Sequence, residues 1–93
     1  MKEGDHMNTE ELYKKAYNLL MKDNLHGIYM VKDIGDSLVF YGGNPNETHY
    51  GIRTVSGNKE TGKVEWFDSN ANREVLKKGK EIDIPSEYKY KAS

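Results

Sequence analysis

The chain contains no cysteine, which excludes disulfide bonds, thiolate metal sites and thiol nucleophiles. It has no apolar run near the roughly 18 residues of a membrane span, and its N-terminal region lacks the apolar core of a signal peptide. The lack of cysteine fits a reducing compartment, so we predict a cytoplasmic protein with no membrane partner. A net charge of −1 also pulls the chain toward neither nucleic acid nor acidic lipid.

Apolar residues are scarce as well. They make up 35% of the 93 residues, against 31% that are charged, which limits the chain to one domain with a small core. Aromatic residues nevertheless reach 11%, which argues against a disordered chain. We interpret residues 7–85 as that domain and residues 86–93 as a mobile polar tail. Residues 1–6 are typical of a cloning remnant, because His6-Met7 is the pair left at a common restriction site, and Met7 is a plausible natural start.

The strongest local pattern covers residues 50–68 and predicts a β-hairpin. Apolar residues alternate with glycine or charged residues in its arms, which are rich in β-branched and aromatic side chains. Between the arms, Asn58 can begin a turn, and Gly62 can supply the left-handed residue that ends it. Trp66, the only tryptophan, is predicted to anchor the core together with Ile52 on the facing arm.

The segment 8–23 has the pattern of an amphipathic helix. Asn8 is its expected N-cap, and Glu11 completes a capping box. An apolar stripe follows at positions i, i+4, i+7 and i+8, namely Leu12, Ala16, Leu19 and Leu20. We expect this stripe to pack on a sheet, with Leu19 as a core anchor and the helix lysines in water.

Two further runs, 27–32 and 37–41, are apolar on both faces and predict inner strands. Tight turns join them to each other and to the hairpin, which makes a meander of four strands. The region 74–84 stays open between an irregular strand and a short helix over 73–78, capped by Asn72 and stopped by Gly79. The predicted fold class is α+β: an N-terminal helix on a four-stranded antiparallel meander, followed by a short C-terminal helix or edge strand.

The sequence contains fragments of motifs for catalysis and cofactor binding, but the residues around them do not meet the requirements of those motifs. Residues 57–63 have the spacing of a P-loop, but Val64 stands where the magnesium-binding Ser or Thr belongs, and strands are predicted on both sides. His26 and His49 lack the spacing of a metal site, and no serine lies in a nucleophile elbow. We therefore predict a protein that is not an enzyme and that has no metal and no cofactor.

The C-terminal end is rich in lysine, with two tyrosines interleaved, a combination that can bind a nucleic acid by phosphate contacts and base stacking. Acidic residues at 74, 81, 83 and 87 dilute its charge, so a solvated segment is the favoured interpretation. A nucleic-acid accessory role remains an alternative.

Two segments that follow the predicted helix, residues 36–41 (DSLVFY) and 61–67 (TGKVEWF), resemble sequences of two groups of small proteins. These are the PepSY-like domains and the small immunity proteins of bacterial toxin systems. The resemblance covers roughly residues 8–68 and rests on turn and strand residues. It implies a non-catalytic binding or inhibitory role in a bacterium, and it assigns no functional residue.

One helix covers only one face of a sheet, so the opposite face is expected to be partly open. We predict that Val31 and Val55 lie on this open face and that Val39, Tyr41 and Phe67 form a partner-binding patch there. The predicted function is a small protein-binding module, such as an inhibitor or immunity-type protein, with a protein partner or a homodimer on this face. A second alternative to this function, beside the nucleic-acid role, is a small ligand-binding domain or enzyme that uses the same face.

Overall fold

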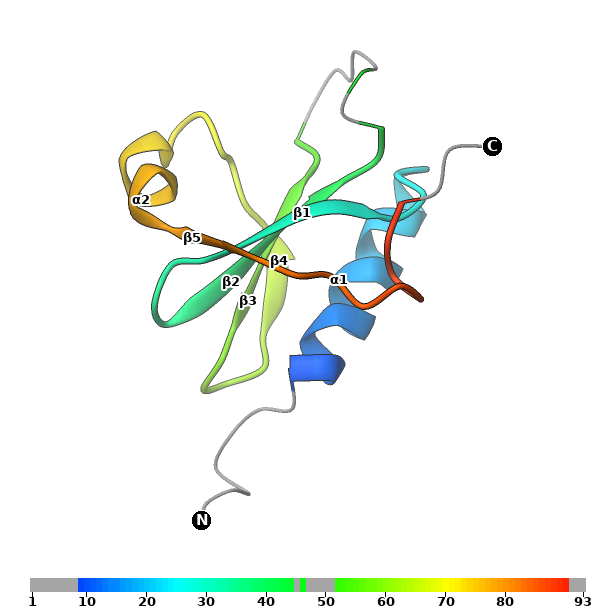
Figure 1. Ribbon diagram of the computed structural model, residues 1–93, viewed down its shortest axis with the longest axis horizontal. Helices are drawn as coiled ribbons and strands as arrows, with labels where there is room; N and C mark the ends of the chain where they lie inside the picture. The colour runs from blue at the N-terminus through cyan, green and yellow to red at the C-terminus, as the bar shows by residue number, and fades with distance from the viewer. Residues whose placement is uncertain (1–8, 45, 47–51, 91–93) are drawn as a thin grey trace.

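The computed structural model, which describes residues 9–44, 46 and 52–90, is a five-stranded antiparallel sheet with a helix packed on one face (Figure 1). The elements in chain order are α1 (Thr9–Lys22), β1 (Ile28–Asp33), β2 (Ser37–Gly42), β3 (Thr54–Asn58), β4 (Val64–Trp66), α2 (Arg73–Lys78) and β5 (Lys80–Ile82). The predicted α+β class is confirmed. The C-terminal region forms both elements between which the sequence leaves the choice open.

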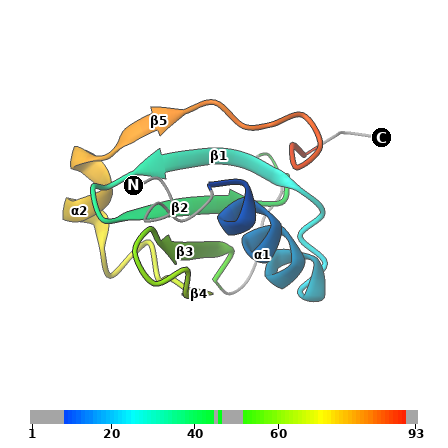
Figure 2. The same ribbon diagram turned by 90° about the horizontal axis from the view of Figure 1, so that it is seen from below.

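The strand order is β4-β3-β2-β1-β5, so the first four strands are the predicted meander and β5 is added beside β1. The chain reaches β5 from the opposite edge by way of α2, which lies near the β1–β2 turn, far from α1 (Figures 1 and 2). Lys32, which is paired with Val39, donates a hydrogen bond from Nζ to the Leu76 carbonyl at 3.2 Å. The segment with α2 therefore covers part of the sheet face opposite α1, which we call the far face.

Helix α1 buries the apolar stripe that the sequence predicts. Leu12, Ala16 and Leu20 are buried, while Leu19 is half-buried and packs against the core. The helix ends where Asn24 takes a left-handed conformation with φ of 63°. The predicted cap Asn8 lies outside the described residues. None of the helices in the described ranges has the length and apolar character needed to cross a membrane.

The core lies between α1 and the inner strands. Phe40 on β2 is its largest fully buried side chain, and the register pairs Phe40 with Val31 on β1 and with Val55 on β3. Paired residues share a face of a sheet, so Val31 and Val55 lie under α1, and their predicted place on the far face is wrong. The Tyr13 ring meets Phe40 edge to face, with ring centroids 5.1 Å apart.

The segment after β5 is part of the core rather than a tail. Tyr88 is buried, and its ring stacks on Tyr13 with the centroids 5.8 Å apart. The Ile28 N–H donates to the Tyr88 carbonyl, and the Tyr90 N–H donates to the Ile28 carbonyl, each at 2.9 Å. The prediction of a mobile tail is therefore wrong for residues 86–90. Residues 91–93, and the predicted remnant at 1–6, lie outside the described residues.

The β3–β4 turn follows the predicted chemistry. Asn58 Oδ1 accepts hydrogen bonds from the N–H groups of Glu60 and Thr61 at 2.8 and 2.9 Å, and Gly62 has a φ of 75°. The strand β3 extends further toward the turn than the alternation predicts, because Gly57 belongs to it. A Cβ at Gly57 would lie 3.2 Å from both Leu12 and Phe40, so this glycine gives the helix its close approach to the sheet.

An ion pair joins the β1–β2 turn to the β3–β4 turn. Lys59 Nζ lies 2.8 Å from one Asp33 carboxylate oxygen and 2.9 Å from the other. Its hydrogen bond, together with the Gly35 N–H, holds the pKa of the Asp33 carboxyl below its usual value. Both side chains are more than a third exposed, so solvent screens the pair.

We expect Asp33→Asn to lower the free energy of unfolding by less than about 1 kcal/mol at neutral pH, as is usual for an exposed pair. The folded-state pKa is lower than the unfolded-state pKa, so the contribution is present above the unfolded-state pKa. It is lost as the pH falls through the folded-state pKa, below 3.8. Urea unfolding of the unmodified protein and of Asp33→Asn across this pH range measures whether their free energies of unfolding become equal at low pH. A difference that stays constant with pH would show that the ion pair is not its cause.

Candidate functional site

The strand β4 forms one edge of the described sheet, and part of its backbone faces away from the other strands. The Lys63 carbonyl and the Phe67 N–H bond to β3 at 2.9 Å each. Because backbone groups change direction at every residue of an antiparallel strand, the N–H and C=O groups of Val64 and Trp66 point outward. These two residues, one on each side of Glu65, form a template on which another strand can pair.

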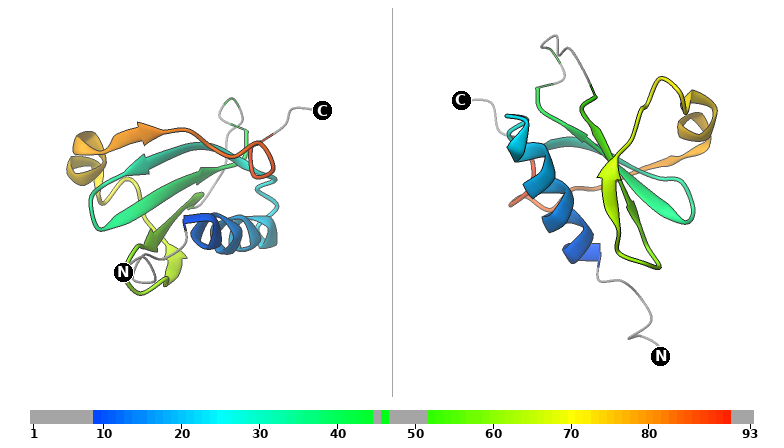
Figure 3. Two further views of the ribbon diagram at one scale, coloured as in Figure 1. Left: turned by 60° about the horizontal axis from the view of Figure 1, so that its bottom comes forward. Right: turned by 180° about the vertical axis from the view of Figure 1, so that it is seen from behind.

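A groove of about 410 Å³ is lined by residues of α1 and of the hairpin that leads into β4. The helix α1 packs on the sheet close to this edge strand (Figure 3). The helix contributes Lys15, Asn18, Leu19 and Lys22, and the hairpin contributes Gly62, Lys63 and Val64. We call this the α1–β4 groove. Leu19 and Val64 are half-buried and pack against the core, so they form an apolar floor. Lys15 Nζ donates a hydrogen bond to the Gly62 carbonyl at 3.1 Å and ties the helix to the hairpin.

Among the residues that the structure describes, the charged ones that line the α1–β4 groove are all basic. They are Lys15, Lys22 and Lys63, and no described Asp or Glu lines the groove. The Nζ of Lys63 lies 3.8 Å from a carboxylate oxygen of Glu65, but both side chains are well exposed, so this pair contributes little. The groove therefore surrounds an apolar floor with positive charge, although the net charge of the chain is −1.

Two of the three predicted core anchors lie at the surface. Trp66 is 38% exposed, because it pairs with Val55 on the α1 side but stands on the edge strand, where the helix leaves it partly uncovered. Ile52 is 41% exposed, because it precedes β3 and lies outside the sheet. The prediction is therefore wrong for both residues. Leu19, the third anchor, packs against the core but also lines the groove.

The predicted partner-binding residues do not form an exposed patch. Val39 is fully buried, so its prediction as a partner contact is wrong. Tyr41 is half-buried beside Tyr29, with ring centroids 5.9 Å apart, and burial raises the pKa of the Tyr41 hydroxyl. Phe67 is half-buried, and its carbonyl accepts a hydrogen bond from the Thr54 hydroxyl. The far face therefore offers an aromatic pair rather than the apolar surface predicted.

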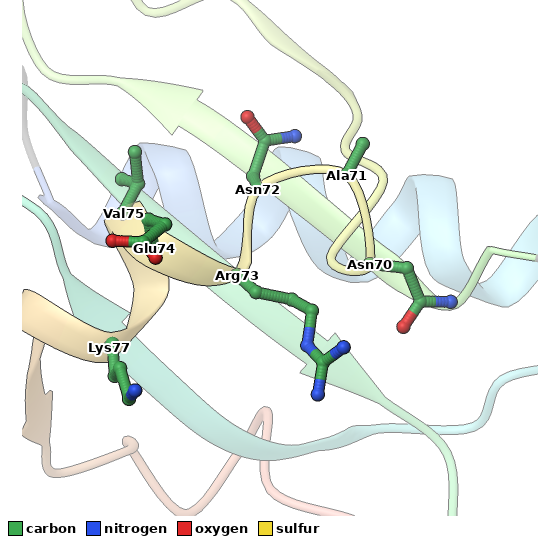
Figure 4. Close-up of a pocket in the computed structure, with 7 residues that line it drawn as sticks. All are labelled: Asn70, Ala71, Asn72, Arg73, Glu74, Val75 and Lys77. Carbon is green, nitrogen blue, oxygen red and sulfur yellow. The ribbon is translucent and has the colours of Figure 1, made fainter.

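A second hollow, of about 530 Å³, lies at the start of α2 (Figure 4). The side chains of Asn70, Arg73 and Lys77 spread outward from the turn in different directions, as the close-up shows. A binding site needs polar groups that converge on one ligand. This hollow lacks that convergence and is a poor candidate site.

The structure also gives the positions of the P-loop-like residues, of His26 and of the lysine-rich segment. Residues 57–63 run from β3 through the turn to β4, so no helix follows the loop as a P-loop requires. Among the residues that the structure describes, no three His, Cys, Asp or Glu side chains are grouped to hold a metal ion. His26 is exposed, and His49 lies outside the described residues. In the lysine-rich segment, Tyr88 is buried against Tyr13 and is not free to stack on a base.

Comparison with protein-family models, with curated proteins and with solved structures finds no match for this chain. The resemblance to PepSY-like domains and to immunity proteins therefore remains a prediction.

The sequence predictions missed the groove because they placed Lys15 and Lys22 on the water-facing side of the helix. The available signal was the shortness of the apolar pattern around Val64, with charged neighbours on each side, which is typical of an edge strand. The rotation of α1 that brings its lysines beside that edge depends on tertiary packing and has no local signature.

Proposed function

We propose that this chain is a small, non-catalytic module that binds another protein through the α1–β4 groove and the adjoining Trp66. The observation that carries the proposal is the exposed tryptophan on an unpaired strand edge, next to a groove with an apolar floor. Tryptophan is among the residues that contribute most to protein interfaces, because it buries a large area with few rotatable bonds.

The proposal extends to an inhibitor or immunity-type protein of a bacterial cytoplasm. The resemblance of residues 36–41 and 61–67 to immunity proteins supports this class, and the absence of cysteine fits the compartment. Such a protein acts by occupying a partner and needs no catalytic group.

A small-molecule site on the far face is the competing function, and one observation favours it. The Arg53 guanidinium lies over the Tyr29 ring, 5.5 Å from its centroid, and the Tyr41 ring packs against the same Tyr29 ring. Rings and a cation of this kind can hold a planar ligand. The two functions therefore predict binding on different sides of the sheet.

Selection from a library of random short peptides tests the proposed function. We expect the peptides that bind the protein to share the α1–β4 groove, because it combines unpaired backbone, apolar floor and exposed aromatic. Trp66→Ala should weaken their binding at least about tenfold, which corresponds to about 1.4 kcal/mol. Titration calorimetry with each selected peptide measures the change.

Val75→Ala is the matched control. Val75 is 44% exposed on α2, so this change also removes an exposed apolar side chain, but at a distant place. It should leave the affinities within about twofold, well below a tenfold step of 1.4 kcal/mol. Selected peptides that tolerate Trp66→Ala but lose affinity on Tyr41→Ala would move the site to the far face. A library that yields no binding peptide would contradict the proposal altogether.

A further inference from the structure

We infer that the partner segment held in the α1–β4 groove is an acidic, extended stretch of a second protein, which adds to the sheet as a new strand beside β4. This inference rests on the proposed function and specifies the chemistry of its ligand. It combines three independent features of the groove: backbone, side-chain alternation and charge.

The backbone of β4 specifies an extended ligand. Val64 and Trp66 each present an N–H and a C=O group outward, in the alternating arrangement that a neighbouring strand uses. A helix satisfies its own backbone groups internally and leaves these four without a partner other than water. A peptide in strand conformation pairs with them directly, and in strand addition these main-chain bonds supply the affinity. Because β4 has three residues, the added strand needs to be only a few residues long.

The alternation of side chains divides the added strand into two sides. Val64 and Trp66 project to the side of α1, where Leu19 forms the floor, so a ligand residue on that side packs on apolar surface. Lys63 and Glu65 alternate with them along β4, and their opposite charges lie 3.8 Å apart, so Glu65 partly neutralises Lys63. The lysines of α1, Lys15 and Lys22, are therefore the main partners for a negative charge on the ligand.

The lysines of α1 fit an acidic residue on each side of one apolar residue. Lys15 and Lys22 lie seven residues apart on one helix, which is about 10 Å along its axis and nearly the same angular position. Two carboxylates four residues apart in a strand, with an apolar residue midway, are separated by about 13 Å. The flexible stems of lysine cover the difference. The pattern expected of the ligand is acidic, any, apolar, any, acidic.

The same charges argue against a second copy of this chain in the groove. Pairing β4 with β4 about a twofold axis would bring two sets of the groove lysines around one interface, with no acidic residue among the lining residues to oppose them. An acidic segment of another protein has the complementary charge. Sedimentation of the free chain provides the corresponding check: a concentration-dependent dimer that Lys22→Glu strengthens would replace the inference with self-association.

A defined peptide probes the inference. It is blocked at both ends and carries Glu-Thr-Val-Thr-Glu at its centre, and the comparison peptide carries Lys in place of Glu. Trp66 is the only tryptophan, so its fluorescence reports binding at this edge of the full-length chain. We expect the acidic peptide to bind at least about tenfold more tightly, a difference of about 1.4 kcal/mol that shrinks as salt is added. Equal binding of both peptides would overturn the charge assignment.

A third peptide separates strand addition from simple charge attraction. It is the acidic peptide with N-methyl groups on alternate amides, prepared in both alternations so that one form blocks the bonds to Val64 and Trp66. We expect that form to lose at least about tenfold in affinity and the other to keep most of it. Equal affinity of both forms would overturn the extended conformation.

Lys22→Glu and Lys78→Glu form the matched pair of variants. Each reverses the charge of one residue in the last turn of a helix, so the loss of favourable interaction with the helix dipole is similar. Only Lys22 lies in the groove. We expect Lys22→Glu to weaken the acidic peptide at least about tenfold and Lys78→Glu to change it less than about twofold. Thermal unfolding confirms that both variants fold. Library peptides that need Trp66 but are neither acidic nor extended would contradict this inference while leaving the proposed function intact.

Discussion

Replacement of Phe40 by alanine is expected to destabilise the protein by about 3–5 kcal/mol, a large share of the stability of a domain this small. Phe40 is fully buried at the centre of the sheet, between Val31 and Val55 in register and against the edge of the Tyr13 ring. Its ring also lies over Gly57, which has no side chain to move into the space left behind. The cavity would therefore stay largely open, and the full cost of a large-to-small change is expected.

Trp66→Ala is the informative comparison, because tryptophan is the larger residue and yet should matter less. With 38% of its surface exposed at the sheet edge, Trp66 loses less buried contact when it is truncated, and we expect a cost below about 2 kcal/mol. Urea unfolding followed by far-ultraviolet circular dichroism compares the two variants with one probe. If Trp66→Ala costs as much as Phe40→Ala, the tryptophan belongs to the core, and the groove loses its aromatic contact.

The elements that were predicted correctly are those with a dense local signature. The stripe of Leu12, Ala16 and Leu20 specifies a buried helix face at 3.6-residue spacing, and this face is buried. Asn58 and Gly62 form the turn that their backbone preferences favour. In each case a few neighbouring residues determine the outcome, so the sequence contains the necessary information.

The face of the first hairpin strand was assigned wrongly for a reason that is also physical. A shift of one residue in the alternation exchanges the two faces of a strand. Placing Ile52 and Thr54 inward left Val55 outward, whereas in the structure Gly57 opens the space under α1 and the odd-numbered residues point to the core. Trp66 then shares the α1 side with Val55 but stands where the helix does not cover it.

The candidate site could not be predicted from local patterns at all. It depends on which strand ends the sheet and on the rotation of α1 over that strand. The order of strands follows from the position of β5, which joins β1 instead of β4 and leaves β4 as an edge. The contacts that place β5 and the Tyr88 segment are long-range, and no spacing within the chain signals them.

Gly27→Ala is the second change with a large expected effect, and it should lower the free energy of unfolding by about 2–5 kcal/mol. Gly27 has a φ of 109°, which costs an L-residue about 1–2 kcal/mol, and a Cβ there would lie 2.5 Å from Tyr90 Cα. That neighbour is backbone, so the clash adds the roughly 1–3 kcal/mol typical of overpacking. The strain is relieved only if the chain around Tyr90 moves away from Ile28, which withdraws Tyr88 from the core.

Gly35→Ala separates the two causes, because Gly35 has the same φ of 109° but no atom within 4 Å of a Cβ at that position. It should cost only the conformational part, about 1–2 kcal/mol. Urea unfolding gives both costs, and hydrogen exchange gives the location: protection of the Ile28 and Tyr90 amides should fall in Gly27→Ala and persist in Gly35→Ala. Equal costs with unchanged protection would mean that the segment 86–90 does not pack on Gly27, and its place in the core would have to be abandoned.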